Sequence, residues 1–143
     1  MRVLLDTHIF LWWLFDDPKL PAGIKGLVTD SGNDIYVSAA SVWEIATKFR
    51  IGKLPHALSV AKNTPLWIEK AGFQALSVTP EHAQLAGSWE IAHRDPFDRM
   101  LAAQSSLEKM ALASVDKAVT LFPIDPISQA VISAMGINNI TIL

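Results

Sequence analysis

The sequence has 143 residues and no cysteine, and charged residues make up only 18% of it. Without cysteine, the chain can form no disulfide framework and offers neither a thiolate zinc site nor a cysteine nucleophile. Because half of its residues are hydrophobic, the low charge excludes a disordered tail or a solvated coiled coil. An excess of basic residues is also missing, since the formal net charge is −2. Binding of nucleic acid by charge alone is therefore disfavoured, although an acidic site can recruit metal ions to contact phosphate.

The N-terminal apolar run over residues 3–15 is too short to be a membrane helix, which needs about 20 residues. It carries Asp6 and His8 and lacks the small-residue cleavage site of a signal peptide. We interpret the run as part of the core. The sequence therefore predicts a soluble, cytoplasmic protein with no membrane partner.

The length predicts one domain over residues 1–143, because a typical domain has about 100–200 residues. Short apolar runs typical of strands alternate with helical patterns. Strands are expected at 3–5, 34–37, 73–78 and 112–115, with a further one at 140–142. Helices are expected at 9–15, 22–29, from Ser38 or Ser41 to 49, at 57–72 with a break near Pro65, at 80–90 and at 96–109. This alternation predicts an α/β fold in which helices cover both faces of a parallel sheet.

Two acidic residues come directly after predicted strands. Asp6 follows the strand at 3–5, and Asp116 follows the strand at 112–115. In parallel sheets, ligands bind outside the carboxyl ends of the strands, so both side chains are expected at the edge where sites form. A single acid in such a position is more often a helix cap or a turn residue, and that alternative stays open for each of them.

Glu44 lies within the helix predicted after the second strand. At 100° per residue it points nearly opposite to the apolar face of that helix. This face comprises Val42, Ile45, Ala46 and Phe49. The simpler interpretation of Glu44 is a solvated acid paired with Lys48 four residues later, and the other is a site residue.

Asp98 lies in the first turn of the helix predicted from residue 96, where the helix dipole favours an acid whatever its function. Asp95 is the expected N-cap, with Pro96 at the first helical position. The expected buried stripe, across the helix from Asp98, comprises Met100, Leu101, Ala103 and Leu107. Ala102 and Ser105 are small, and would leave room for a metal ion or a substrate beside Asp98.

Four segments, in order along the chain, form a set that resembles a known family. They are Leu-Leu-Asp-Thr-His at 4–8, Val-Ser-Ala-Ala-Ser-Val-Trp-Glu-Ile at 37–45, His-Arg-Asp-Pro-Phe-Asp-Arg-Met-Leu-Ala-Ala-Gln at 93–104 and Leu-Ala-Ser-Val-Asp-Lys-Ala at 112–118. The set resembles the PIN-domain ribonucleases, and among them the VapC-type toxins of bacterial toxin–antitoxin pairs. The resemblance implies a three-layer α/β/α PIN-like domain with a mostly parallel central sheet. It also implies an acidic quartet, which consists of Asp6, Glu44, Asp98 and Asp116.

Two features depart from the family pattern. Ser114 stands where the family usually has threonine, two residues before the fourth acid, and this change keeps the hydroxyl group. After Asp116 the chain continues through residues 119–143, an atypical C-terminal segment with a helix-like stretch at 127–135. Asp125 in this segment is a less favoured alternative to Asp116 as the fourth acid of the site.

The resemblance implies a metal-dependent endoribonuclease that acts on single-stranded RNA. Two carboxylates about 4–5 Å apart repel each other by about 3–4 kcal/mol at an effective dielectric constant near 20, so the quartet requires a counter-charge. Oxygen ligands favour Mg²⁺, for which Mn²⁺ can substitute. The metal would activate a water that attacks phosphorus, leaving 5′-phosphate and 3′-hydroxyl ends as the family implies. Asp6 and Asp98 are the expected direct metal contacts, and Glu44 and Asp116 would bind directly or through water.

Other residues are expected to surround the acids. The candidates for supporting the site are Thr7, Asp95 and Ser114. The candidates for binding substrate phosphates are Lys48, Arg94 and Arg99. Thr7 is alternatively a helix cap, and each of the three basic residues is alternatively an ordinary surface charge. Trp43, beside Glu44, is expected to pack, to stack on an RNA base or to cover an antitoxin helix.

The resemblance also implies two protein partners, a second copy of the chain in a homodimer and a cognate antitoxin whose C-terminal segment obstructs the site. Two alternatives stay open: a DNA-directed nuclease with the same type of site, and a PIN-fold binding module that has lost catalysis. A phosphatase of the haloacid-dehalogenase type is disfavoured. Such an enzyme needs a second aspartate two residues after the nucleophile, where this chain has His8.

Overall fold

The structure, a computed structural model, describes residues 1–92, 94–116 and 122. Within these residues, four parallel strands form one sheet in the order β3-β2-β1-β4. The strands are β1 (Arg2–Leu5), β2 (Asp34–Ser38), β3 (Gln74–Leu76) and β4 (Ala111–Ala113). The helices are α1 (Thr7–Leu14), α2 (Ala22–Thr29), α3 (Ala39–Arg50), the 3₁₀ turn η1 (Pro55–Ala57), α4 (Leu58–Lys62), α5 (Thr64–Lys70), α6 (Pro80–Ser88) and α7 (Pro96–Glu108).

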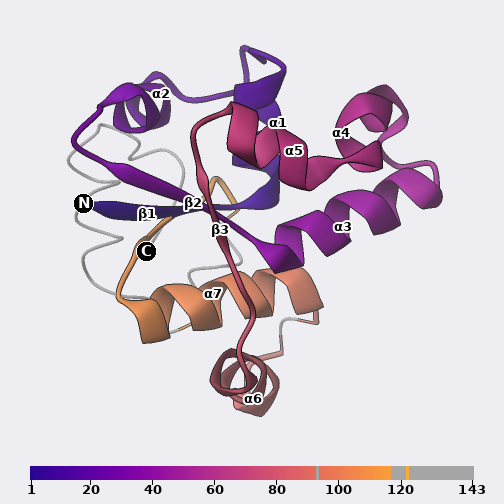
Figure 1. Cartoon of the computed structure of the whole chain (residues 1–143). Coiled ribbons are helices and arrows are strands. Elements are labelled where there is room, and N and C mark those ends of the chain that lie inside the picture. The colour runs from indigo at the N-terminus through magenta and orange to yellow at the C-terminus, as the bar shows by residue number, and fades with distance from the viewer. Residues whose placement is uncertain (93, 117–121, 123–143) are drawn as a thin grey trace.

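Helices cover both faces of the sheet, with α1, α2 and α5 on one side and α6 and α7 on the other (Figure 1). The central strand β1 is apolar throughout for this reason, and Val3, Leu4 and Leu5 are all fully buried. Val3 and Leu5 pack in a core with Phe10 of α1, whereas Leu4 packs in a second core with Leu101 of α7. The predicted three-layer α/β/α fold with a parallel sheet is confirmed.

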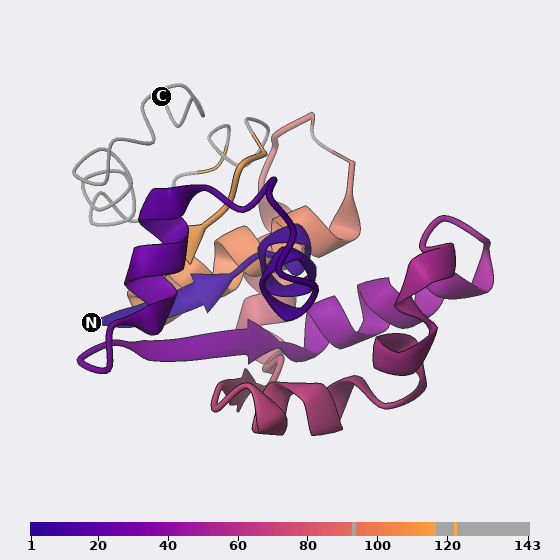
Figure 2. The ribbon, with the colours of Figure 1, turned by 90° about the horizontal axis from the view of Figure 1, so that it is seen from above.

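The carboxyl ends of β1, β2 and β4 lie at the same edge of the sheet. Leu5 pairs with Val37 on one side and with Ala113 on the other, and the Asp6 N–H donates to the Ala113 carbonyl at 3.0 Å. Figure 2 shows that β2 runs directly into α3, of which Ser38 is the N-cap. The residues that directly follow Leu5, Val37 and Ala113 therefore lie together at this edge. They are at positions 6, 38 and 114.

The helical region predicted at 57–72 is interrupted at Asn63 rather than at Pro65. The Asn63 side chain caps α5 by accepting the Leu66 N–H at 3.3 Å. Pro65 lies in the first turn of α5, where the missing N–H would have had no helical partner anyway. The proline therefore marks the start of a helix and not a break within one.

The C-terminal elements only partly coincide with their predictions. β4 is Ala111–Ala113 rather than 112–115, because its pairing with β1 begins where Ala111 meets Val3. The strand predicted at 140–142, the helix-like stretch at 127–135 and Asp125 lie outside the described residues. Among the helices that the structure describes, none is long and apolar enough to cross a membrane.

Candidate active site

Asp6 lies where β1 ends and α1 begins, and both of its carboxylate oxygens accept hydrogen bonds. Oδ1 accepts the Ile9 N–H at 2.8 Å, which makes Asp6 the N-cap of α1, and Oδ2 accepts the Ser114 hydroxyl at 2.5 Å. The residue is only 5% exposed. Burial raises the pKa of this carboxyl and the charge of Glu44 adds to the rise, against the hydrogen bonds from Ser114 and Ile9 and the nearby His8. Asp6 is thus both a helix cap and a buried acid at the edge of the sheet.

Glu44 is buried, with 3% of its surface exposed. Its interpretation as a solvated acid is therefore wrong, although Lys48 is indeed its partner. Oε2 lies 2.5 Å from Lys48 Nζ, and Oε1 lies 2.5 Å from Thr7 Oγ1. Ser41 Oγ lies 2.9 Å from the same Thr7 oxygen. A carboxylate only accepts, so Thr7 uses its one hydroxyl proton to donate to Glu44. The Ser41 hydroxyl then donates to the Thr7 oxygen.

Helix α3 is buried on two sides, which the helical wheel did not predict. Ile45 is fully buried against the sheet core, but Ala46, which was expected on the same apolar face, is exposed. The side that carries Glu44 faces α1 through the hydrogen bond from Thr7. A helical wheel based on hydrophobicity identifies only the apolar side that carries Ile45. The side that carries Glu44 is polar, and its groups are buried because they form hydrogen bonds and an ion pair with one another.

Lys48 brings acids of α3 and α7 into one electrostatic environment. Its side chain is 26% exposed and its ammonium pairs with Glu44. Burial alone would lower the pKa of Lys48, but the hydrogen bond and charge of Glu44, together with the charges of Asp95 and Asp98, outweigh burial and raise it. The ammonium is therefore charged at neutral pH and is influenced by three carboxylates from two helices.

Asp95 is the N-cap of α7, as predicted. Its Oδ1 accepts the Phe97 N–H at 2.9 Å and the Asp98 N–H at 3.2 Å. Asp98 itself is half-buried in the first turn of the helix. The cap fixes the start of α7 and, with it, the backbone position from which the Asp98 side chain projects.

The buried stripe of α7 differs from the predicted one. Leu107, which was expected inside, is 45% exposed, whereas Ala102 and Ser105 are fully buried. Ala102 packs in the same core as Leu4 of the sheet, so the small residues lie on the side of the helix that packs against the sheet and are not open to solvent or to a ligand. Ala102 and Ser105 follow Asp98 by four and seven residues, which places Asp98 on the sheet-facing side of α7 and not across from it.

Ser114 links the positions of the first and fourth predicted acids. It is fully buried, donates to Asp6 Oδ2, and accepts the Asp116 N–H at 3.0 Å. Asp116 is exposed at this edge of the sheet, and its rival Asp125 lies outside the described residues. The serine that replaces the usual threonine therefore supplies the hydroxyl that orients Asp6.

The donor groups at this edge suit a hard divalent cation by their chemistry. They are carboxylate and hydroxyl oxygens, and Asp6 is a buried acid whose charged form a nearby cation would stabilise. In the part of the chain that the structure describes, no three His, Asp or Glu side chains form a group that could hold a metal ion. Asp6 and Glu44 influence each other electrostatically, and the complete quartet as a metal site stays a prediction.

Arg99 has a structural role that the sequence did not reveal. Its guanidinium donates to the carbonyls of Ala86, Trp89 and Ile91 at 2.7, 2.6 and 2.9 Å. These contacts tie the end of α6 and the segment after it to α7, and a substrate phosphate would have to compete with three carbonyls for the same N–H groups. Arg94, the other arginine predicted to bind phosphate, is exposed. The acceptors are backbone carbonyls, which every residue has, so no pattern of side chains in the sequence could have predicted this contact.

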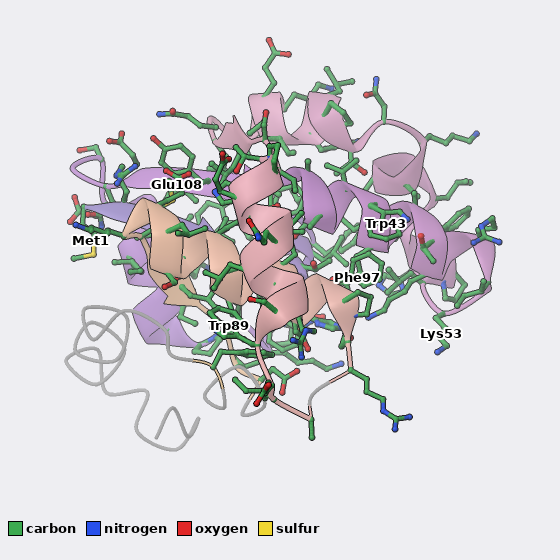
Figure 3. The ribbon with its side chains drawn as sticks, turned by 90° about the horizontal axis from the view of Figure 1, so that it is seen from below. Met1, Trp43, Lys53, Trp89, Phe97 and Glu108 are labelled. Carbon is green, nitrogen blue, oxygen red and sulfur yellow. The ribbon has the colours of Figure 1, made fainter. Side chains whose placement is uncertain are left out.

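An apolar groove lies beside the site, between α3, α6 and α7. Its volume is about 340 Å³, and its lining includes Ala40, Trp43, Val78, Gly87, Phe97 and Met100. Trp43 is 61% exposed and contacts Phe97 edge to face, with ring centroids 4.8 Å apart (Figure 3). Trp43 is therefore not a core residue, and its ring is accessible to a base or to a partner.

The chain resembles known proteins over most of its length. A 58-residue stretch is 41% identical to Ribonuclease VapC16 of Mycobacterium tuberculosis, and covers 41% of this chain and 41% of that protein. The match thus spans less than half of the mycobacterial ribonuclease. The crystal structure of VapBC2 from Rickettsia felis bound to a DNA fragment from their promoter has a TM-score of 0.61, with 14% identity, and the match covers 86% of this chain and 94% of that chain. Identity this low supports a common fold alone. The family model of the PIN domain matches residues 3–122, and the chain therefore belongs to the PIN domain family.

Proposed function

We propose that the protein is a metal-dependent endoribonuclease that hydrolyses phosphodiester bonds of single-stranded RNA, and that it is the toxin of a VapC-type toxin–antitoxin pair. One observation carries the proposal: Asp6 and Glu44 are two buried acids from different elements of a PIN domain, and Thr7, the residue after Asp6, donates a hydrogen bond to Glu44. Buried acids cost folding stability, and their presence at this edge of the sheet favours a catalytic use. The local similarity to a protein named Ribonuclease VapC16 supports the choice of RNA.

The proposed metal ligands are Asp6, Glu44, Asp98 and Asp116, and the proposed ion is Mg²⁺, for which Mn²⁺ substitutes. When bound, the ion would activate water as the nucleophile and stabilise the charge that develops on the leaving oxygen. The products would carry 5′-phosphate and 3′-hydroxyl ends. No side chain is assigned as an independent general base.

The hydroxyl groups of the chain orient the acids. Ser114 donates to one oxygen of Asp6 and Thr7 donates to one oxygen of Glu44, so each carboxylate is held in one orientation with lone pairs left for other ligands. Asp95 fixes the first turn of α7 by accepting two of its N–H groups. Thr7, Asp95 and Ser114 are therefore proposed as supporting residues, which position the acids without contacting the substrate.

The proposed RNA contacts are basic and aromatic side chains. Lys48 and Arg94 would bind substrate phosphates, and Trp43 would stack on a base of the single strand. Arg99 is a weaker candidate, because its guanidinium already donates to three carbonyls. The apolar groove beside Trp43 would receive the cognate antitoxin, and the toxin would act in the cytoplasm as a homodimer.

Cleavage assays on single-stranded RNA and DNA of the same sequence test this proposal. With Mg²⁺ or Mn²⁺ the wild-type protein should cleave RNA, and a chelator or the Asp98→Asn substitution should abolish cleavage. Cleavage of DNA in preference to RNA would instead establish the alternative of a DNA-directed nuclease. Sequencing the 5′ ends of cellular RNAs after brief expression would then identify the RNA target.

One observation favours the second candidate, a PIN-fold binding module without catalysis. No group of three potential ligands in a metal-binding arrangement is found among the described residues. Calorimetric titration with Mn²⁺ separates the two candidates. A catalytic site should bind Mn²⁺ in a manner that Asp6→Asn abolishes, whereas a module that has lost catalysis should bind none.

A further inference from the structure

The ammonium of Lys48 is paired with a buried acid of the site, whereas the ammonium of a lysine that only binds substrate is expected to face solvent. Its ammonium lies 2.5 Å from Glu44 Oε2, and the Glu44 side chain is only 4% exposed. In the absence of substrate, a phosphate-binding lysine normally keeps its ammonium in water at the mouth of a site, because the ammonium is strongly hydrated. Here the head group points inward to a buried carboxylate.

The charges around this ammonium come from two helices that are distant in the sequence. Glu44 lies on α3, four residues before Lys48, and the charges of Asp95 and Asp98 at the start of α7 act on the same ammonium. The ammonium thus contacts one carboxylate, that of Glu44, and attracts the charges of Asp95 and Asp98 at longer range. Without it, the first turn of α7 and the middle of α3 would repel each other where α3 and α7 pack together.

From this placement we infer that Lys48 is a tethered cation, which holds the acids of α3 and α7 together in the metal-free protein and must leave Glu44 before a divalent cation can use that carboxylate. The inference rests on the proposed metal-dependent function. A divalent ion and an ammonium cannot share one carboxylate oxygen at contact distance without strong repulsion. Thr7 already occupies one acceptor site on the other oxygen of Glu44, so the exchange is assigned to the oxygen that faces Lys48.

The four-carbon stem of lysine gives this exchange a simple path. The Lys48 side chain is 26% exposed, so its ammonium can turn toward solvent by rotation of its own side chain while α3 stays in place. Released from Glu44, the ammonium lies at the mouth of the site, where it can contact a substrate phosphate. Metal binding and phosphate binding would then be coupled through one residue.

Three substitutions in the full-length protein test the inference by calorimetric titration with Mn²⁺ and by thermal unfolding. Lys48→Met keeps the apolar stem and removes the charge, and should bind Mn²⁺ about tenfold more tightly than wild type. Its melting temperature should fall by about 4–8 °C in chelator, because the buried Glu44 loses its cationic partner and keeps only the hydrogen bond from Thr7, and the loss should largely disappear in Mn²⁺. Lys48→Arg keeps the charge and can hold Glu44 with two N–H groups, so it should fold normally and bind Mn²⁺ more weakly. Lys53→Met, an exposed lysine just beyond α3 (Figure 3), is the matched control and should behave as wild type.

The outcomes separate this inference from the proposed function. If wild type binds Mn²⁺ and neither substitution of Lys48 changes the affinity, the tethered-cation role is refuted while the metal site stands. If Lys48→Met does not fold, the weaker binding expected of Lys48→Arg still decides the question. If wild type and Lys48→Met both bind no Mn²⁺, both proposals fail, and binding by Lys48→Met alone would show that the lysine blocks the site.

Discussion

Replacing Asp6 by asparagine is expected to stabilise the protein at neutral pH in the absence of divalent metal. The substitution removes a buried negative charge that faces the charge of Glu44. Asparagine keeps the oxygen that accepts the Ile9 N–H, and it caps helices about as well as aspartate. Its amide N–H₂ can donate to Ser114 Oγ, which has a second lone pair in addition to the one that accepts the Asp116 N–H. The hydrogen bonds of the site are therefore conserved in number while the repulsion is removed.

The gain should be about 1–3 kcal/mol, because asparagine avoids the cost of burying a charge, which is the main cause of the raised pKa of Asp6, and also the smaller repulsion from Glu44. For a protein of this size it corresponds to about 3–10 °C in melting temperature. Because the pKa of Asp6 is raised in the folded state, its stabilising contribution is complete below the unfolded aspartate pKa of about 3.9. That contribution is lost as the pH rises through the folded-state value. The difference between Asp6→Asn and wild type should therefore vanish near pH 4 and grow toward pH 7.

Differential scanning fluorimetry from pH 4 to pH 7.5, with chelator and with Mn²⁺, measures these differences. Asp34→Asn is the control, because Asp34 is an exposed acid at the opposite edge of the sheet and its loss changes the net charge equally. In saturating Mn²⁺ the order should reverse, since ligand at 100 times its dissociation constant stabilises a protein by about 2.7 kcal/mol. A marked fall in the melting temperature of Asp6→Asn at pH 7 in chelator would refute the reasoning, as it would show that Asp6 is needed as a charged cap.

Three further substitutions test other parts of the site. Asp98→Asn should abolish metal-dependent RNA cleavage and growth arrest with a change of at most about 2 °C in melting temperature; unchanged toxicity on expression would remove Asp98 from the site. Arg99→Met should lower the free energy of unfolding in urea by about 2–4 kcal/mol, because three partly buried carbonyls lose a charged donor, and a loss below about 0.5 kcal/mol would show that the contacts are dispensable. Ser114→Ala should raise the pKa of Asp6 further, by removing its strongest opposing hydrogen bond, and should weaken Mn²⁺ binding measured by calorimetry, whereas Ser114→Thr should restore it. Equal binding by Ser114→Ala and Ser114→Thr would contradict the orienting role of the hydroxyl.

The features that the sequence predicted well are those that depend on local chemistry. The apolar run before Asp6 identified a strand buried on both faces, and the Asp95-Pro96 pair identified a helix start. Parallel strands place the residues after β1 and β4 at one edge, so Asp6 was expected near the end of the last of these strands, although the predicted neighbour was Asp116 and the observed hydrogen-bond partner is Ser114. The strand and the helix start could be predicted because each depends on residues within one strand or one turn.

The features that the sequence did not reveal depend on packing between distant elements. Glu44 looked solvated because its neighbours on the helix surface are polar, and only the approach of Thr7 from α1 buries it. Ala102 and Ser105 looked like an open space because they are small, but small residues are also what a helix needs in order to lie close to a sheet. Hydrophobicity patterns cannot distinguish a small residue at an open site from one at a tight contact.

The hydrogen bond between Asp6 and Ser114 joins positions separated by 108 residues, and this separation sets when the site can form during synthesis. A nascent chain that grows by about 5–20 residues per second makes the second position some 5–20 s after the first. During that interval β1 can already pair with β2 and Asp6 can already cap α1, but the other edge of β1 and the second oxygen of Asp6 lack their partners until β4 and Ser114 are translated. The acidic centre therefore cannot be completed before position 114 has been translated, and a ribosome that stalls earlier would release a fragment without it.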